Sequence, residues 1–159
     1  MNVKPTKTNE GNKMPIRRQG LAALVRINGV DAYTCWDSGS ELDAISPKFI
    51  RAVGIPPNPK EEALRIQLGT KGSSSRTSYE VKPTLNIGNT KLEHPIDVVN
   101  LDRWDLLLGS PFCNQYRAVL DCGMRTIRFS DTVVKTLSLD EEAAIRRSNP
   151  AVHLQAISQ

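Results

Sequence analysis

The sequence predicts a mostly β fold, built as a single domain with a tail at each end. Short runs of apolar and β-branched residues alternate with turns rich in glycine, proline, asparagine and serine, which is typical of a protein made of many short strands. The chain has 159 residues, the size of one domain with short tails. Hydrophobic residues make up 39% of the chain, which is enough for a small core.

The first expected element is a β-hairpin over residues 21–36. Residues 21–27 and 30–36 are apolar and β-rich. The Asn28-Gly29 pair between them favours a type I′ turn, because both central residues of that turn need a positive φ. The second strand ends at Trp36 and presents the segment Asp-Ser-Gly-Ser, residues 37–40, at the end of the sheet. Strand alternation predicts that the Trp36 side chain points away from Asp37.

A short helix is expected to begin at Ser46-Pro47. Serine caps the free N–H groups of a first helical turn, proline is preset for that turn, and Gly54 ends the helix. A second helix of the same kind is predicted at Ser110-Pro111, after a buried strand at residues 106–108 and Gly109. The repeated order of strand, glycine turn and Ser-Pro helix suggests two related lobes about a pseudo-twofold axis.

The middle of the chain predicts a long hairpin followed by one more strand. Residues 63–68 and 79–87 are the expected hairpin strands, and the polar segment 69–78 forms a tip that can move. Pro83 indicates an edge or a bulge in the returning strand. Residues 92–99 predict another strand, interrupted at Pro95.

The last part of the chain predicts a hairpin and a peripheral helix. Residues 119–121 and 126–129 are expected to pair around Cys122-Gly123. Ser138 and Glu141 have the spacing of a capping box, and the order of early acids and late arginines suits the helix dipole. We therefore divide the chain into a flexible basic leader (1–19), a folded domain (20–130) and a peripheral helix with a tail (131–159).

Composition argues against several classes of site. The three cysteines and two histidines include no CxxC pair, so neither a zinc site nor a disulfide framework is predicted, and no metal or cofactor is expected. No apolar run has the length of a transmembrane helix, so no membrane partner is expected. The net charge of +4 comes without interleaved aromatic residues for base stacking, so nucleic acid is not an expected partner. Reduced cysteines suit the cytoplasm.

The order of the motifs resembles the retropepsin-like aspartic proteases. Residues 37–40, the Ser-Pro helix, the Gly- and Ser-rich hairpin and the segment DVVNLDRWDLLLGSPF carry the likeness over residues 20–130. It is greatest to proteases of Ty3/Gypsy-type LTR retrotransposon polyproteins. The resemblance implies a closed β-barrel with short helices and a flap hairpin, one lobe per chain. It also implies an aspartic endopeptidase that processes a retroelement polyprotein in the cytoplasm or within retroelement particles.

The resemblance implies a role for each residue of the site. Asp37 would be the catalytic carboxylate, Ser38 would hold the turn by bonding to a partner chain, and Gly39 would make the turn tight. We hypothesise that the Ser40 hydroxyl bonds to this carboxylate, favours its ionised form and lowers the pH optimum. The supporting inner strand would be Leu107, Leu108 and Gly109, and the flap over the substrate would be Lys71, Gly72, Ser73, Ser74 and Ser75.

The chemistry of such a site requires two carboxylates. Peptide hydrolysis without a metal needs one group to take a proton from water and another to protonate the carbonyl oxygen. Two neighbouring carboxylates cannot both ionise, so they share one proton and serve both purposes. Asp121 is followed by cysteine rather than a hydroxyl residue, with no Leu-Leu-Gly strand behind it, and is interpreted as a hairpin residue. The resemblance therefore implies a homodimer, with one Asp37 from each chain, acting on an extended peptide.

Two other functions stay open. The fold could be a non-catalytic binding or dimerisation module, but an intact Asp-Ser-Gly favours catalysis, since a like-charge pair at an interface is costly to keep. A small nucleic-acid-binding β-domain rests on the net charge of +4 and the basic leader, and the sequence shows neither a zinc knuckle nor an aromatic platform to support it.

The remaining polar residues receive structural interpretations. Asp43 is expected to be a loop or cap residue, Asp105 a hydrogen-bond acceptor, and His94 an exposed residue beside Pro95. Cys35 and Cys113 are expected in the core.

Overall fold

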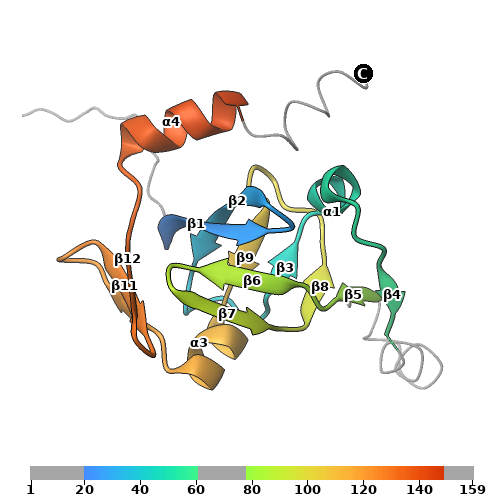
Figure 1. Cartoon of the computed structure of the whole chain (residues 1–159), viewed down its shortest axis with the longest axis horizontal. Coiled ribbons are helices and arrows are strands. Elements are labelled where there is room, and N and C mark those ends of the chain that lie inside the picture. Colours follow the sequence, from blue (N-terminus) through green and yellow to red (C-terminus); the bar gives the residue numbers. More distant parts are fainter. Residues whose placement is uncertain (1–19, 61–77, 149–159) are drawn as a thin grey trace, which may run out of the picture.

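The computed structural model describes residues 20–60 and 78–148, and their backbone is mostly β (Figure 1). The predicted leader at 1–19, the strand at 63–68, the flap residues 71–75 and the tail from 149 lie outside these ranges. The described strands are β1 (Leu21–Ile27), β2 (Val30–Trp36), β3 (Ala44–Ile45), β4 (Asn58–Pro59), β5 (Tyr79–Val81), β6 (Thr84–Ile87), β7 (Thr90–Glu93), β8 (Ile96–Val98), β9 (Leu106–Leu108), β10 (Val119–Asp121), β11 (Thr126–Phe129) and β12 (Thr132–Lys135). The described helices are α1 (Pro47–Val53), α3 (Ser110–Tyr116) and α4 (Leu139–Ser148).

The strands form one large curled sheet and one small sheet. The large sheet has the order β4-β5-β8-β3-β9-β2-β1-β6-β7, and β10, β11 and β12 pair antiparallel in the small one. Strands β4 and β7 are the edges of the large sheet, and no pairing joins them within the described residues. The fold is therefore a curled half-barrel with short helices, and closure of the barrel stays an expectation.

The predicted first hairpin is confirmed over its full length. Strands β1 and β2 pair antiparallel from Leu21 opposite Trp36 to Ile27 opposite Val30. Asn28 and Gly29 have φ values of 52° and 76°, as the type I′ turn requires. This register puts the end of β2, and with it Asp37, next to the start of β1.

Strand β9 lies between β2 and β3 and positions the candidate site. It runs parallel to β2, with Trp36 opposite Leu108, and antiparallel to β3. Leu106 and Leu108 are fully buried, whereas Leu107 is half-buried, so the burial predicted from the continuous apolar run is confirmed for two of its three residues. The end of β9 therefore lies directly beside the end of β2.

Both Ser-Pro helices are confirmed, but their first turns are capped differently. The Ser46 hydroxyl accepts a 3.1 Å hydrogen bond from the N–H of Lys48, and Gly54, at φ 80°, ends α1. Helix α3 has Gly109 at its N-cap, so its own cap residue offers no side-chain acceptor. The acceptor comes instead from a distant part of the chain, as described below.

Two predicted strands are shorter than expected because proline interrupts them. The predicted strand at 79–87 is wrong as a single element: β5 ends before Pro83 and β6 begins after it, and the two occupy different parts of the sheet. Proline cannot donate to a strand ladder, which explains the break. The strand predicted at 92–99 with an interruption at Pro95 is divided in the same way between β7 and β8.

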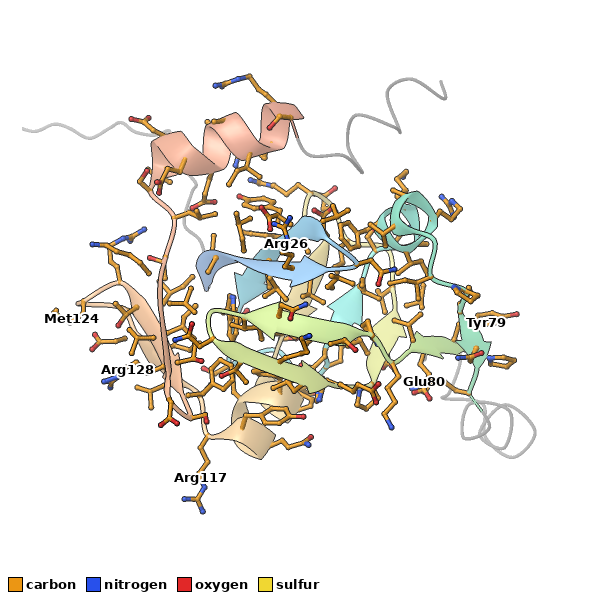
Figure 2. All side chains as sticks on the ribbon, viewed as in Figure 1. Arg26, Tyr79, Glu80, Arg117, Met124 and Arg128 are labelled. Carbon is orange, nitrogen blue, oxygen red and sulfur yellow. The ribbon has the colours of Figure 1, made fainter. Side chains whose placement is uncertain are left out.

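The C-terminal region carries the predicted hairpin and helix, with one additional strand. Strand β12, beyond residue 130, pairs with β11 and extends the hairpin to three strands. Arg117, Met124 and Arg128 project outward around this small sheet (Figure 2). Helix α4 begins with the predicted capping box: the N–H of Ser138 donates to Glu141 Oε1 at 2.8 Å, and the N–H of Glu141 donates to Ser138 Oγ at 3.1 Å.

The core is centred on aromatic side chains that lie behind β2. Trp36 is fully buried, meets Phe112 edge to face at 5.5 Å between ring centroids, and lies 6.3 Å from Phe129. Its side chain therefore points into the core, as strand alternation predicts. Cys35 and Cys113 are buried as expected. None of the helices within 20–60 and 78–148 has the length and apolarity that a membrane span requires.

Candidate active site

Asp37 lies in a tight turn immediately after β2. Its backbone carbonyl accepts a 3.0 Å hydrogen bond from the N–H of Ser40, and its Oδ1 accepts a 2.9 Å hydrogen bond from the N–H of Gly39. Asp37 is half-buried, whereas Ser38 and Gly39 are exposed. The turn therefore presents one oriented carboxylate at the surface, flanked by small residues that let another molecule approach closely.

The predicted inner strand holds one end of this turn, and the first residue of α3 holds the other. The N–H of Asp37 donates a 3.0 Å hydrogen bond to the carbonyl of Leu108. The N–H of Ser110 donates a 2.7 Å hydrogen bond to the carbonyl of Ser40. Gly109 lies between these two contacts, and a Cβ built there would come within 2.4 Å of the Leu42 carbonyl oxygen and 2.7 Å of the Ser40 carbonyl oxygen. Close packing against the turn therefore requires glycine at this position.

The predicted hydrogen bond between Ser40 and the Asp37 carboxylate is wrong. The Ser40 hydroxyl donates instead to the carbonyl of Leu42 at 3.0 Å and accepts from the N–H of Leu42 at 3.4 Å. Serine side chains readily make such local bonds to backbone two residues ahead, and here that bond satisfies the hydroxyl. Ser40 therefore shapes the exit of the turn, and no direct effect on the Asp37 carboxylate follows from its side chain.

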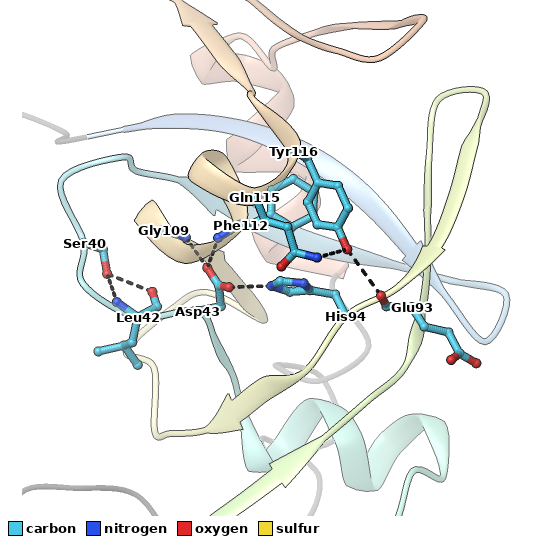
Figure 3. A network of polar contacts seen from close by, with 9 residues as sticks. All are labelled: Ser40, Leu42, Asp43, Glu93, His94, Gly109, Phe112, Gln115 and Tyr116. Carbon is cyan, nitrogen blue, oxygen red and sulfur yellow. Dashed lines mark hydrogen bonds and ion pairs between the residues drawn. The ribbon is translucent and has the colours of Figure 1, made fainter.

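Asp43 is buried and bonds to the start of α3, a contact between residues far apart in the sequence. Its Oδ1 accepts hydrogen bonds from the N–H of Gly109 at 2.7 Å and from the N–H of Phe112 at 3.4 Å (Figure 3). Asp43 thus supplies the acceptor that the glycine N-cap of α3 lacks. Its interpretation as a cap residue is confirmed, although the helix that it caps lies about seventy residues later in the chain.

His94 is the residue that sequence reasoning placed wrongly. It was expected to be exposed beside Pro95, but only 2% of its surface is exposed. Its Nε2 lies 2.6 Å from Asp43 Oδ2, and its ring meets those of Phe112 and Tyr116 edge to face. Neither contact has a local signal in the sequence, because Asp43 is 66 residues from Gly109 and 51 residues from His94.

Two nearby carboxylates contribute to a raised pKa of the buried Cys113 thiol. Burial, followed by the negative charges of Asp43 and Asp37, raises the pKa of the Cys113 thiol to about 11. Cys113 therefore stays protonated at neutral pH and is not a nucleophile of this site. Its shift reports that α3 brings a titratable side chain close to both carboxylates.

The other acidic residues considered from the sequence have structural roles. Asp105 is buried, and its Oδ2 accepts a 2.9 Å hydrogen bond from the N–H of Tyr33, as predicted. Asp121 Oδ1 accepts a 2.9 Å hydrogen bond from the N–H of Met124 within the β10–β11 turn, which fits a hairpin residue. The described part of the chain holds no group of three or more His, Cys, Asp or Glu side chains that could bind a metal ion.

The proposed flap lies outside the described residues, and the described strands that precede and follow it, β4 and β5, are neighbours in the sheet. Strands β4 and β5 pair antiparallel, and the N–H of Lys60 donates a 2.8 Å hydrogen bond to the carbonyl of Ser78. The Lys60 ammonium forms a 2.8 Å ion pair with Asp97 of β8. The segment that contains Lys71, Gly72, Ser73, Ser74 and Ser75 therefore leaves and re-enters the sheet at adjacent positions.

Comparisons with known proteins agree with this architecture. The family model described as "Retroviral aspartyl protease" matches residues 16–135. Among solved structures, the chain is similar to the retroviral protease-like domain of Ddi1 from Leishmania major, with 13% identity and a TM-score of 0.57 over 77% of this chain and 97% of that one. It is also similar to the EIAV protease complexed with the inhibitor HBY-793, with 12% identity and a TM-score of 0.48 over 69% and 99% of the two chains. No curated protein gives a significant match.

Proposed function

The chain belongs to the retroviral aspartyl protease family, and we propose that it is an active aspartic endopeptidase in which Asp37 is the catalytic residue. The observation that carries this proposal is the carboxylate of Asp37 at an accessible turn, oriented by the N–H of Gly39 at 2.9 Å. The inner strand bonds to one end of that turn, and the first residue of α3 bonds to the other. Such a rigid support keeps a catalytic group in a fixed geometry.

The second carboxylate of the reaction comes from an identical chain. Asp43 and Asp105 are buried and bonded to backbone N–H groups, and Asp121 is engaged in its own hairpin turn. By contrast, the exposure of Ser38 and Gly39 leaves the Asp37 turn accessible to a second copy. A homodimer would bring two Asp37 carboxylates together across a twofold axis, and Ser38 would bond across that axis.

The paired carboxylates would divide the chemical work between them. Because like charges at short range cannot both be ionised, one carboxylate is protonated and the other is not. The ionised group takes a proton from the attacking water, and the protonated group donates its proton to the carbonyl oxygen of the scissile peptide. Leu107, Leu108 and Gly109 support the turn while the flap, residues 71–75, closes over an extended peptide.

The substrate is proposed to be a polyprotein of a Ty3/Gypsy-type retroelement. The ordered set of motifs from residue 37 to residue 112 supports this origin. Processing of such a polyprotein would take place in the cytoplasm or within the assembled particle. We also propose that the barrel is closed, although the described sheet is open between its edge strands β4 and β7.

The test is cleavage of a mixed peptide library by the wild-type protein, by Asp37→Asn and by Asp121→Asn as the matched control. Each protein is assayed at several concentrations from acid to neutral pH, with its dimerisation measured by sedimentation. We expect the wild type and Asp121→Asn to cleave with a specific activity that rises with concentration, and Asp37→Asn to be inactive. A folded wild-type dimer that cleaves nothing would instead support a non-catalytic dimerisation module.

A further inference from the structure

We propose that Asp43 is a positioning residue of the catalytic turn, and that His94 holds the Asp43 carboxylate in its working orientation. This inference rests on the proposed function, because it assigns a role in orienting Asp37. Asp43 does not touch the Asp37 carboxylate in any hydrogen bond that the structure shows. It acts through Gly109, the residue that packs against the turn.

The first step is the contact between Asp43 and Gly109. Asp43 Oδ1 accepts from the N–H of Gly109 at 2.7 Å, a short hydrogen bond of the charge-assisted kind (Figure 3). The same oxygen accepts from the N–H of Phe112 at 3.4 Å. The carboxylate is 5% exposed, so water competes little for these bonds. The position of the Gly109 backbone is therefore set by the Asp43 side chain.

The second step is the contact between Gly109 and the turn. The residues on either side of Gly109 bond to the two ends of the turn, Leu108 to Asp37 at 3.0 Å and Ser110 to Ser40 at 2.7 Å. Gly109 itself lies against the carbonyls of Ser40 and Leu42 so closely that a single Cβ would not fit. A displacement of the Gly109 backbone would therefore move the whole turn, and the Asp37 carboxylate with it.

The third step is the contact between Asp43 and His94. His94 Nε2 lies 2.6 Å from Asp43 Oδ2, and the His94 tautomer that carries a proton on Nε2 donates across this contact, because a carboxylate oxygen is an acceptor. The edge-to-face contacts of the ring with Phe112, at 5.1 Å, and with Tyr116, at 5.5 Å, fix its plane. His94 thereby removes the rotational freedom that would let Asp43 release Gly109.

The burial of the Asp43–His94 pair is energetically costly, which argues that the pair does more than fill the core. His94 Nδ1 is buried without a hydrogen-bond partner among the described residues. A buried polar pair with an unsatisfied atom is often no more stable than a well-packed apolar replacement. Helix α1 shows that a short helix of this fold can be capped by the serine at its own N-cap. A long-range carboxylate is therefore not needed merely to begin a helix.

The experiment compares Asp43→Leu, Asp43→Asn and His94→Phe with Asp105→Asn as the matched control. Asp105 is equally buried and also accepts from a backbone N–H, but it lies at the opposite end of β9. We expect Asp43→Leu to lower kcat roughly 100-fold with KM nearly unchanged, the size of effect that a misplaced catalytic group produces. Asp43→Asn keeps an oxygen for Gly109 and should rescue most of that loss. His94→Phe should fall between them, and kcat of Asp105→Asn, which likewise keeps an oxygen for its backbone donor, should stay at the wild-type value.

A second readout does not depend on cleavage. The amide of Gly39 bonds to Asp37 Oδ1, so its NMR chemical shift reports the orientation of that carboxylate. We expect this resonance to shift in Asp43→Leu and His94→Phe and to stay in place in Asp105→Asn. Where Asp43→Leu does not fold, His94→Phe alone decides the matter. Unchanged kcat and an unmoved Gly39 resonance in a folded variant would overturn the positioning role. A moved resonance in the variants, together with a folded wild-type protein that cleaves nothing, would instead reject the proposed function and leave the positioning role intact.

Discussion

The N–H of Ser110 donates a 2.7 Å hydrogen bond to the carbonyl of Ser40, so the first residue of α3 is bonded to the last residue of the turn that carries Asp37. Leu108 bonds to the other end of that turn through the N–H of Asp37. Gly109 is enclosed between these two contacts. The turn and the strand–helix junction that supports it therefore behave as one structural unit. A displacement of Gly109 should change the position of the Asp37 carboxylate.

Gly109→Ala should both destabilise the fold and abolish cleavage. The backbone at Gly109 has a φ of −105°, which any residue can adopt, so the constraint is space alone. The new methyl group would meet the backbone carbonyls of Leu42 and Ser40, which cannot rotate away as a side chain would. We expect a loss of about 1–3 kcal/mol in the free energy of unfolding, measured in urea.

Gly123→Ala is the control for that substitution. Its Cβ would make only an ordinary contact, 3.6 Å from Asp121 Oδ1. We expect the free energy of unfolding and the cleavage rate of this variant to stay close to those of the wild type. Equal effects of the two substitutions would contradict the steric argument.

Most of the main-chain elements followed from local signals in the sequence. The β1–β2 hairpin was predicted with its bounds, because Asn28-Gly29 specifies both the turn and the register. The capping box of α4 was also predicted, since a Ser and a Glu three residues apart bond to each other's backbone without help from elsewhere. Local chemistry therefore sufficed wherever the interacting groups are neighbours in the chain.

The parts that the sequence did not predict depend on contacts between distant residues. The capping of α3 by Asp43 crosses 66 residues to Gly109, and the burial of His94 depends on that same carboxylate. Ser40 had two partners within reach, and the choice of the Leu42 backbone over Asp37 depends on the path of the turn. Strand order is similarly non-local: Pro83 indicated an irregularity at this point, but the separation of β5 and β6 in the sheet depends on distant strands.

Trp36→Ala should cost far more stability than Trp36→Phe. The Trp36 side chain is fully buried against Phe112 and Phe129, so truncation to alanine leaves a large cavity. We expect a loss of about 3–5 kcal/mol for alanine. The indole Nε1 is buried without a hydrogen-bond partner among the described residues, and phenylalanine removes that atom. In Trp36→Phe, the small cavity lowers the stability, and the loss of the unpaired indole N–H partly offsets that loss. Urea unfolding of both variants measures the two changes in the free energy of unfolding.

Tyr33→Phe should loosen α4 from the sheet. The Tyr33 hydroxyl bonds to Glu142 Oε1 and accepts a 3.3 Å hydrogen bond from Arg146, so two hydrogen bonds between α4 and β2 share this oxygen. Removal of the hydroxyl should cost about 1–3 kcal/mol, because buried Glu142 loses a partner. Hydrogen exchange of the α4 amides would reveal the loosening. Leu139→Ala, at a position that is 70% exposed, should leave exchange unchanged beyond the first turn.

The stability of the protein should fall as the pH rises above 9, and Cys113 should account for part of this fall. Burial, and then the charges of Asp43 and Asp37, raises the pKa of Cys113 from 9.0 to about 11 in the folded protein. The unfolded chain therefore releases this proton at lower pH than the folded chain does. The stabilisation is fully present below pH 9 and is lost between pH 9 and about 11, at about 1.4 kcal/mol per pH unit.

The measurement is urea unfolding of the wild type and of Cys113→Ala at pH 8 and at pH 10. The alanine variant loses packing at both pH values, so the informative quantity is the difference between its two losses. We expect the wild type to lose more stability than Cys113→Ala between the two pH values. Tyr33, whose pKa is raised to about 12 chiefly by burial, contributes equally to both proteins and cancels. An identical pH dependence in the two proteins would rule out Cys113 as a source of the alkaline loss. Asp43→Asn should lower the pKa of Cys113, and so should Asp37→Asn by a smaller amount, because each substitution removes a negative charge that opposes the thiolate.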